Sequence, residues 1–285
     1  MWLLEGHDEL SDAPASLARY DAEAQLEWRL ELDSSGQAVD ASSLLYHEGA
    51  LYLALRTRDD SGQLILERRA LSGATTWTRS DYAPPATSSA LRSARLIGVS
   101  GSTLAMVATP PLTDYGPSYP LSVDIETGAV QWSGEDGHDP LTMTVGDAHV
   151  YLGWVRPPTV ELADTTSSLS LHAPSSGAQI SLGELSWPEL DWNSSSQDPR
   201  SLVSGWMGAQ LVTILASAGA HGYAIHDVDG ERQCQGSFAL EFVALQAAVG
   251  IEGRSQLVAQ VSVTLDDEGD VAERGLLVIE PGTKD

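Results

Sequence analysis

Cysteine, lysine and asparagine are almost absent from this chain of 285 residues. Cys234 is the only cysteine, so neither an intrachain disulfide nor a cysteine-based metal cluster can form. The single Lys284 and Asn193 indicate biased codon use or adaptation to salt, of a bacterial kind. The chain has 15 Lys and Arg against 40 Asp and Glu, a formal net charge of −25. Such a surface repels nucleic acid and anionic lipid, so neither is expected as a partner.

Long apolar runs are absent too. No stretch of 18 or more apolar residues occurs, so no membrane-spanning helix is expected. Residues Met1–Glu9 are acidic and lack the basic and apolar regions of a secretory signal. This favours a cytoplasmic protein, or one whose leader is missing from this sequence. No amphipathic helical pattern separates the apolar segments, which excludes a stack of βαβ units.

Small turns recur at a nearly constant spacing. Their centres are Ala24, Gly73, Gly128, Gly177, Gly230 and Gly282. Successive centres are 49, 55, 49, 53 and 52 residues apart, which indicates a repeat architecture. Gly suits a tight hairpin because one residue there commonly adopts the left-handed conformation, in which a Cβ is costly.

Short segments rich in β-branched and aromatic residues lie between the turns and are interpreted as strands. In the unit that ends near residue 80, strands are expected at Ser43–Tyr46, Ala50–Arg56, Leu64–Ala70 and Thr75–Thr78. Four strands in about 50 residues are typical of a β-propeller blade. The second strand of each unit is the most apolar, as expected between neighbouring blades. We therefore predict an all-β chain, a β-propeller of four-stranded antiparallel blades in a single domain, 1–285.

The terminal units, 1–40 and 240–285, are incomplete. The first begins with what we interpret as second, third and fourth strands; the last stops after a third strand, Leu276–Glu280. Because an open blade leaves unpaired edges, we expect the two units to close the ring together. Pairing of Gln25–Leu32 with Leu276–Glu280 would give five blades. The alternatives are six blades with three-stranded terminal units, or membership of a larger ring.

A Trp follows the turn centre by four residues in three units, at Trp28, Trp77 and Trp132. Together with its apolar strand and polar turn, the segment Val123–Trp132 resembles the repeat of quinoprotein (PQQ-like) propellers. By period the resemblance extends over nearly the whole chain, and it fades where Ser181 and Cys234 occupy the Trp position. It implies that the three Trp residues pack between adjacent blades. WD40 and kelch propellers fit less well, because their Trp-Asp and Gly-Gly doublets are missing.

The resembling family has two branches. Its alcohol and sugar dehydrogenases hold a quinone over calcium, and many have an adjacent cysteine pair, which a single Cys excludes. No matching set of calcium ligands occurs either. The chain looks like the other branch, similar to the outer-membrane assembly lipoprotein BamB, which binds no cofactor and serves as a docking surface. That resemblance implies a periplasmic or cell-surface location.

Motifs that would indicate catalysis or metal binding are weak in this sequence. Residues 98–101 approach the Gly-x-Ser-x-Gly elbow but lack its spacing and its helix. His172 and His226 occupy equivalent positions ahead of their turns, which favours a structural role over metal binding. Asp227 and Asp229 suggest a calcium loop, yet they lie on the recurring hairpin, where turn chemistry is favoured. Asp266 begins an acidic segment expected at a solvated hairpin tip. No catalytic, cofactor-binding or metal-binding residue is assigned, and a metal role of these three Asp residues stays open.

Loops offer the best candidates for binding. The Pro-rich segments Pro110–Pro120 and Pro157–Thr166 interrupt the repeat, and rigid scaffolds usually carry function on loops. Four Trp residues gather in the third and fourth units: Trp154, Trp187, Trp192 and Trp206. Trp187–Trp192 is expected in a connection between blades. Core packing is favoured for these residues, and contact with a peptide or sugar is the alternative.

The function expected from the sequence is a non-catalytic propeller that binds a protein or peptide partner through its faces and inter-blade loops, with no cofactor. One alternative is a quinone-dependent oxidoreductase or a hydrolase that uses carboxylates around the central channel. The other is a carbohydrate-binding protein that uses its loop Trp residues.

Overall fold

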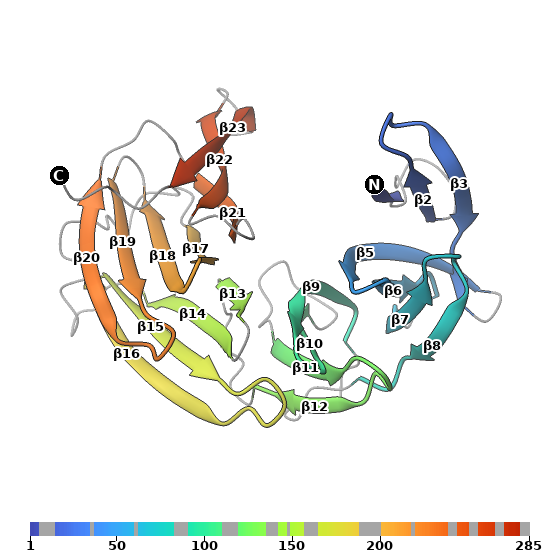
Figure 1. Ribbon diagram of the computed structural model, residues 1–285, viewed down its shortest axis with the longest axis horizontal. Coiled ribbons are helices and arrows are strands. Elements are labelled where there is room, and N and C mark those ends of the chain that lie inside the picture. The colour runs from blue at the N-terminus through green and yellow to red at the C-terminus, as the bar shows by residue number, and fades with distance from the viewer. Residues whose placement is uncertain are drawn as a thin grey trace. The chain divides into compact units, whose positions relative to one another are not determined.

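The computed structural model describes fourteen segments of the chain: residues 1–5, 15–34, 37–59, 62–82, 91–109, 119–134, 142–146, 149–156, 165–187, 201–217, 220–238, 244–250, 256–265 and 271–279. Every regular element in these segments is a β-strand, and none is a helix. The strands form six antiparallel sheets, here called blades 1 to 6 in chain order (Figure 1).

The first three blades contain strands β1 to β12. Blade 1 consists of β1 (Trp2–Glu5), β2 (Ser16–Tyr20) and β3 (Leu26–Glu31). Blade 2 consists of β4 (Asp33–Ser34), β5 (Gln37–His47), β6 (Ala50–Thr57), β7 (Leu64–Ala70) and β8 (Thr75–Arg79). Blade 3 consists of β9 (Ser93–Ser100), β10 (Thr103–Thr109), β11 (Tyr119–Asp124) and β12 (Val130–Ser133).

The last three blades contain strands β13 to β23. Blade 4 consists of β13 (Thr142–Val145), β14 (Val150–Arg156), β15 (Thr165–His172) and β16 (Gln179–Trp187). Blade 5 consists of β17 (Ser201–Met207), β18 (Gln210–Ser217), β19 (Ala220–His226) and β20 (Arg232–Phe238). Blade 6 consists of β21 (Ala244–Gly250), β22 (Leu257–Leu265) and β23 (Val271–Ile279). In every blade the strands pair in chain order, so the predicted antiparallel blades are confirmed.

The terminal blades are three-stranded, as the six-bladed alternative predicts. Within the described residues, β3 pairs with β2, and β23 pairs with β22 in a separate sheet. The composite blade of Gln25–Leu32 beside Leu276–Glu280 is therefore not formed by these strands. A short hairpin costs less loop-closure entropy than a pairing across most of the chain, which favours β2 as the partner of β3. The first unit also ends earlier than predicted, because Asp33–Ser34 already pairs with β5.

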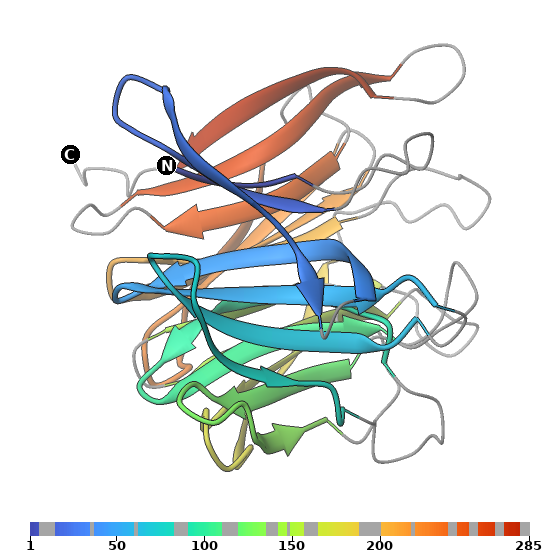
Figure 2. The same ribbon diagram turned by 90° about the vertical axis from the view of Figure 1, so that its right-hand side faces the viewer.

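Residue contacts divide the chain into two compact units. Unit 1 contains residues 1–139 and 174–177, and unit 2 contains residues 140–173 and 178–285. Blades 1 to 3 therefore belong to unit 1 and blades 4 to 6 to unit 2. In unit 1, the blue strands of blade 1, the blue and teal strands of blade 2 and the green strands of blade 3 lie above one another in Figure 2. That residues 1–285 form a single domain stays a prediction.

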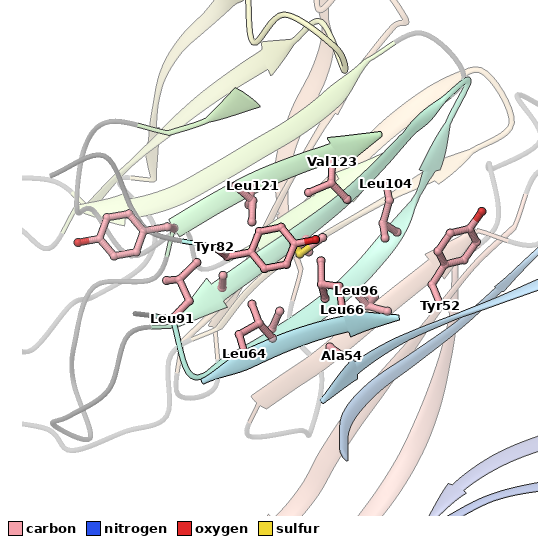
Figure 3. Packing of buried hydrophobic residues seen from close by; sticks show 14 of the residues in the cluster. Tyr52, Ala54, Leu64, Leu66, Tyr82, Leu91, Leu96, Leu104, Leu121 and Val123 are labelled. Carbon is pink, nitrogen blue, oxygen red and sulfur yellow. The ribbon is translucent and has the colours of Figure 1, made fainter. Parts of the chain in front are cut away.

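The core of unit 1 lies between its blades. Alternate side chains of β6 serve two separate clusters: Leu51, Leu53 and Leu55 pack with blade 1, whereas Tyr52 and Ala54 pack with blade 3. Figure 3 shows the second cluster, in which residues of blade 2 lie opposite Leu104, Leu121 and Val123 of blade 3. Residues of a strand alternate between its two faces, so a strand buried on both must be apolar throughout. This confirms the prediction for the second strand of blade 2.

Unit 2 has a corresponding core between blades 4 and 5. Its fully buried residues are Tyr151, Leu169, Leu171, Leu185, Leu202, Leu211, Leu215 and Ala224. Two hydroxyl pairs cross the same interface: Tyr151 OH lies 2.9 Å from Thr213 Oγ1, and Thr142 Oγ1 lies 2.9 Å from Ser204 Oγ. Each buried hydroxyl thus has a hydrogen-bond partner, which removes the cost of burying it.

The recurring turns have the backbone conformation that the sequence predicts. Gly73 and Gly128 have φ angles of 86° and 68°, in the left-handed region. Ala24, which replaces Gly in the first turn, has a φ of 60°. The turn position therefore requires positive φ even where the residue carries a Cβ. Gly282 lies outside the described residues.

Candidate functional site

The three Trp residues of the repeat pack against the turn of the following blade. A Cβ built on Gly73 would lie 3.6 Å from Trp28 Cη2, and one on Gly128 would lie 2.8 Å from Trp77 Cζ3. The ring of Trp132 occupies the corresponding position at Gly177, a residue that groups with unit 1. The inter-blade packing implied for Trp28, Trp77 and Trp132 is confirmed. These residues are structural and leave the binding surface to other side chains.

The suspected calcium loop at Asp227 is held by ordinary turn chemistry. Asp227 Oδ1 accepts hydrogen bonds from the backbone amides two and four residues further on, at 3.0 and 2.8 Å. Its Oδ2 accepts one from Gln233 Nε2 at 2.8 Å. The carboxylates of Asp21 and Asp124 accept amides in the same way in their own turns. In the described part of the chain, no three His, Cys, Asp or Glu residues form a group that could hold a metal ion. Asp266 lies outside it.

His172 and His226 are indeed equivalent, since each is the last residue of the third strand of its blade. His172 Nε2 lies 2.8 Å from Ser170 Oγ. His226 is only 1% exposed. Burial lowers the pKa of His226, the charge of Arg232 lowers it further, and Asp227 opposes this. Both side chains are buried inside the repeat, which agrees with the structural role expected from the sequence.

Most of the predicted binding loops fall outside the described residues. This applies to residues 110–118 and 157–164, and to Trp192. Trp187, expected in a connection, is instead the last residue of β16 and pairs with Thr165. The prediction failed because β16 continues beyond the register shift in its ladder with β15. Trp206 packs against the core between blades 4 and 5.

A cluster that sequence reasoning missed lies at one end of blades 2 and 3. Asp40 of β5 accepts hydrogen bonds from Arg56 Nη2 at 2.7 Å and from Arg58 Nε at 2.8 Å. The side chains of Asp40 and Arg58 are 19% and 23% exposed, and that of Arg56 is 44% exposed. Burial raises the pKa of Asp40, but the hydrogen bonds and charges of the two arginines lower it by a larger amount. The pKa of Asp40 is therefore below its ordinary value.

Arg92 belongs to the same end. Ser42 Oγ donates to the carbonyl oxygens of both Ala54 and Ala94, at 3.0 and 3.1 Å, and so joins β5, β6 and β9. Asp40 precedes Ser42 by two residues, and Arg92 precedes Ala94 by two. Arg56 follows Ala54 by two residues. Asp40 pairs with Arg56 in the ladder of β5 and β6, and Arg92 directly precedes β9. Arg92 therefore lies at the end of blade 3 that adjoins Asp40 and Arg56.

Two further contacts fix the surroundings of Arg92. Its Nε would be 3.1 Å from a Cβ on Gly62, in the loop between β6 and β7. The amide of Leu64 donates to the carbonyl oxygen of Leu91 at 2.7 Å, which holds the start of β7 beside the residue before Arg92. Arg56, Arg58 and Arg92 are called the arginine cluster below. The signal that could have revealed it is local charge: residues 50–95 hold seven Arg against four Asp and Glu.

No protein-family model and no curated protein matches the chain. Solved structures do match. Saccharomyces cerevisiae Sqt1 is similar with a TM-score of 0.51 and 10% identity, over 87% of this chain and 63% of that one. Kuenenia stuttgartiensis hydrazine synthase gives a TM-score of 0.50 and 11% identity, over 84% and 62%. The chain thus spans less than two thirds of either protein.

The β-propeller domain of the Trilobed protease from Pyrococcus furiosus is also similar, with a TM-score of 0.48 and 12% identity, over 85% of this chain and 68% of that one. At such identities likeness concerns the fold alone, and the decisive observation is the series of antiparallel blades with a common turn. The chain is a β-propeller. No helix in the described part of this propeller is long and apolar enough to cross a membrane.

Proposed function

We propose that this propeller is a non-catalytic scaffold that binds a protein or peptide partner. The observation that carries the proposal is the arginine cluster, because it combines half-buried charged donors with a rigid support at the end of two blades. Binding groups are commonly presented in this way, at the ends of a scaffold that does not itself move.

The titratable groups elsewhere favour a scaffold over an enzyme. Glu67 is paired with Arg69 inside blade 2 at 2.6 Å, and Asp227 is used by the backbone of its turn. An active site usually needs several perturbed groups that converge on one cavity. Glu67 and Asp227 instead lie in separate blades, and each has a structural partner.

We also propose that the propeller belongs to the BamB-like, non-catalytic branch of quinoprotein-type propellers and acts outside the cytoplasm. The support is the packing of Trp28, Trp77 and Trp132 on the turns of the following blades, which agrees with the repeat of that family. The location follows from this resemblance alone.

Affinity capture from the source cells, followed by titration calorimetry with the purified partner, tests the proposal. The expected result is saturable binding at a fixed stoichiometry. Failure of every captured protein to bind in purified form would contradict it.

The alternatives have their own measurements. PQQ with Ca²⁺ should leave the Tm unchanged, because a ligand that does not bind the native state cannot stabilise it. A glycan array should likewise stay negative. A rise in Tm with the quinone would favour an oxidoreductase, and a concentration-dependent glycan signal would favour carbohydrate binding.

A further inference from the structure

We propose that the partner segment recognised by this propeller is acidic, and that its carboxylates bind the arginine cluster. This inference rests on the proposed function and names the chemistry of the partner.

Charge distribution is the first observation. Residues 50–95 carry a net charge of +3, in a chain whose total is −25. The stretch from β6 to the start of β9 is therefore positive, although blade 2 as a whole is not, in a strongly anionic protein. An acidic segment is repelled by the rest of the surface and attracted here, so electrostatics alone would direct it to this end of the blades.

Hydrogen-bonding capacity is the second observation. A guanidinium has five N–H donors. Arg56 donates a hydrogen bond to Asp40, and its side chain is 44% exposed. Arg56 therefore has donors within reach of a ligand. Carboxylates of a ligand would supply the acceptors in the geometry that Arg favours.

The third observation concerns Arg92. Its Nε is buried and has no hydrogen-bond partner within the described residues. An unsatisfied buried donor is costly, and more so when it carries charge. Arg92 as a whole residue is only partly buried. A carboxylate that binds the exposed part of this residue would offset part of the cost of its buried charge.

The depth of the cluster distinguishes it from a set of ordinary surface arginines. Arg58 and Asp40 are each less than a quarter exposed. Ion pairs in such surroundings are screened less by salt and water than exposed pairs are. A segment with a few carboxylates is favoured over a nucleic acid, because a long polyanion would also meet the acidic remainder of the surface.

Fluorescence anisotropy with two labelled ten-residue peptides tests the inference. One peptide alternates Glu and Ser, and the other has Gln in place of every Glu. The protein should bind the Glu peptide at least about tenfold more tightly than the Gln peptide at low salt, and the difference should shrink as salt is added.

Variants locate the site. Arg92→Gln and Arg58→Gln should each weaken binding of the Glu peptide about tenfold, as expected for loss of one charge-assisted contact. Arg232→Gln, which removes an exposed arginine of blade 5, is the matched control and should bind as the original protein does. Far-UV circular dichroism and thermal melting establish that each variant is folded. Arg92→Lys keeps the positive charge, so it should recover part of the affinity that Arg92→Gln loses.

Three results with the peptides would overturn the inference. The first is equal affinity for the Glu and Gln peptides, and the second is unchanged binding in both cluster variants. The third is competition by inorganic phosphate without any preference for the Glu peptide, which would indicate a site for small anions. A purified partner that binds equally well to Arg92→Gln and Arg58→Gln would overturn this inference and leave the proposed function standing.

Discussion

The indole of Trp77 lies against Gly128, the turn residue of the following blade. Trp77 Nε1 donates a hydrogen bond to the carbonyl oxygen of Ile125 at 3.0 Å, and a Cβ on Gly128 would approach Cζ3 to 2.8 Å. Tyr82 OH donates to the carbonyl oxygen of Gly128 at 2.9 Å. Two aromatic side chains from the end of blade 2 thus hold one turn of blade 3. Gly is needed there for space as well as for backbone conformation.

A methyl group at this turn should therefore destabilise the protein for two reasons. Gly128→Ala places a side chain at a φ of 68° and forces it against Trp77. Gly49→Ala is the matched control, because Gly49 has a φ of 80° and no atom within 4 Å of its Cβ position. We expect a loss of about 1 kcal/mol at Gly49 from backbone strain and about 2 kcal/mol more at Gly128 from overpacking. Urea unfolding measures both, and equal losses would contradict the role of Trp77.

The first turn offers the reverse experiment. Ala24 has a φ of 60°, which a residue with a Cβ adopts at a cost. Ala24→Gly should raise the free energy of unfolding by about 0.5–1 kcal/mol, because relief of strain exceeds the added entropy of the unfolded chain. Ala22→Gly, in the same turn but without a positive φ, should lower stability. A lower Tm for Ala24→Gly would show that this turn is not strained.

Breaking the buried ion pair of blade 2 should be costly. Glu67 Oε2 accepts from Arg69 Nε and Nη2 at 2.8 and 2.6 Å, and the two side chains are 3% and 7% exposed. Arg69→Met leaves a buried carboxylate without its partner and should cost about 3–5 kcal/mol. The double variant Glu67→Leu, Arg69→Met should recover most of that loss, because it buries no charge. Denaturant unfolding of the single and double variants tests this, and a double variant as unstable as the single one would contradict it.

Stability should fall in mild acid because of His226. Burial lowers the pKa of this imidazole below 6.5, its value in the absence of such effects. The unfolded chain therefore binds a proton more readily than the folded protein does. The contribution of His226 is constant above pH 6.5 and is lost as the pH falls from 6.5 toward the lower pKa of the folded state, with a limiting slope of about 1.4 kcal/mol per pH unit.

Unfolding measured across this pH range checks the prediction. His226→Leu should flatten the curve of unfolding free energy against pH. An identical pH dependence for His226→Leu and the original protein would show that another group is responsible.

Local sequence signals predicted the features that neighbouring residues decide. The spacing of Gly73 and Gly128 gave the period, because a positive φ within a hairpin depends on a few adjacent residues. The apolar run of β6 indicated burial on both faces, which the two clusters on either side of it confirm. The ends of strands were less accurate, as Trp187 shows, since a ladder can continue past a register shift.

The sequence by itself determined the repeat, the turns and the Trp residues that hold one blade to the next, because these depend on spacing along the chain. Only the tertiary structure decided that Asp40, Arg56 and Arg92 share one end of two blades. They belong to or adjoin three different strands, and a shared hydrogen bond of Ser42 joins those strands. No local pattern encodes which residues of separate strands become neighbours, since register and blade packing set it.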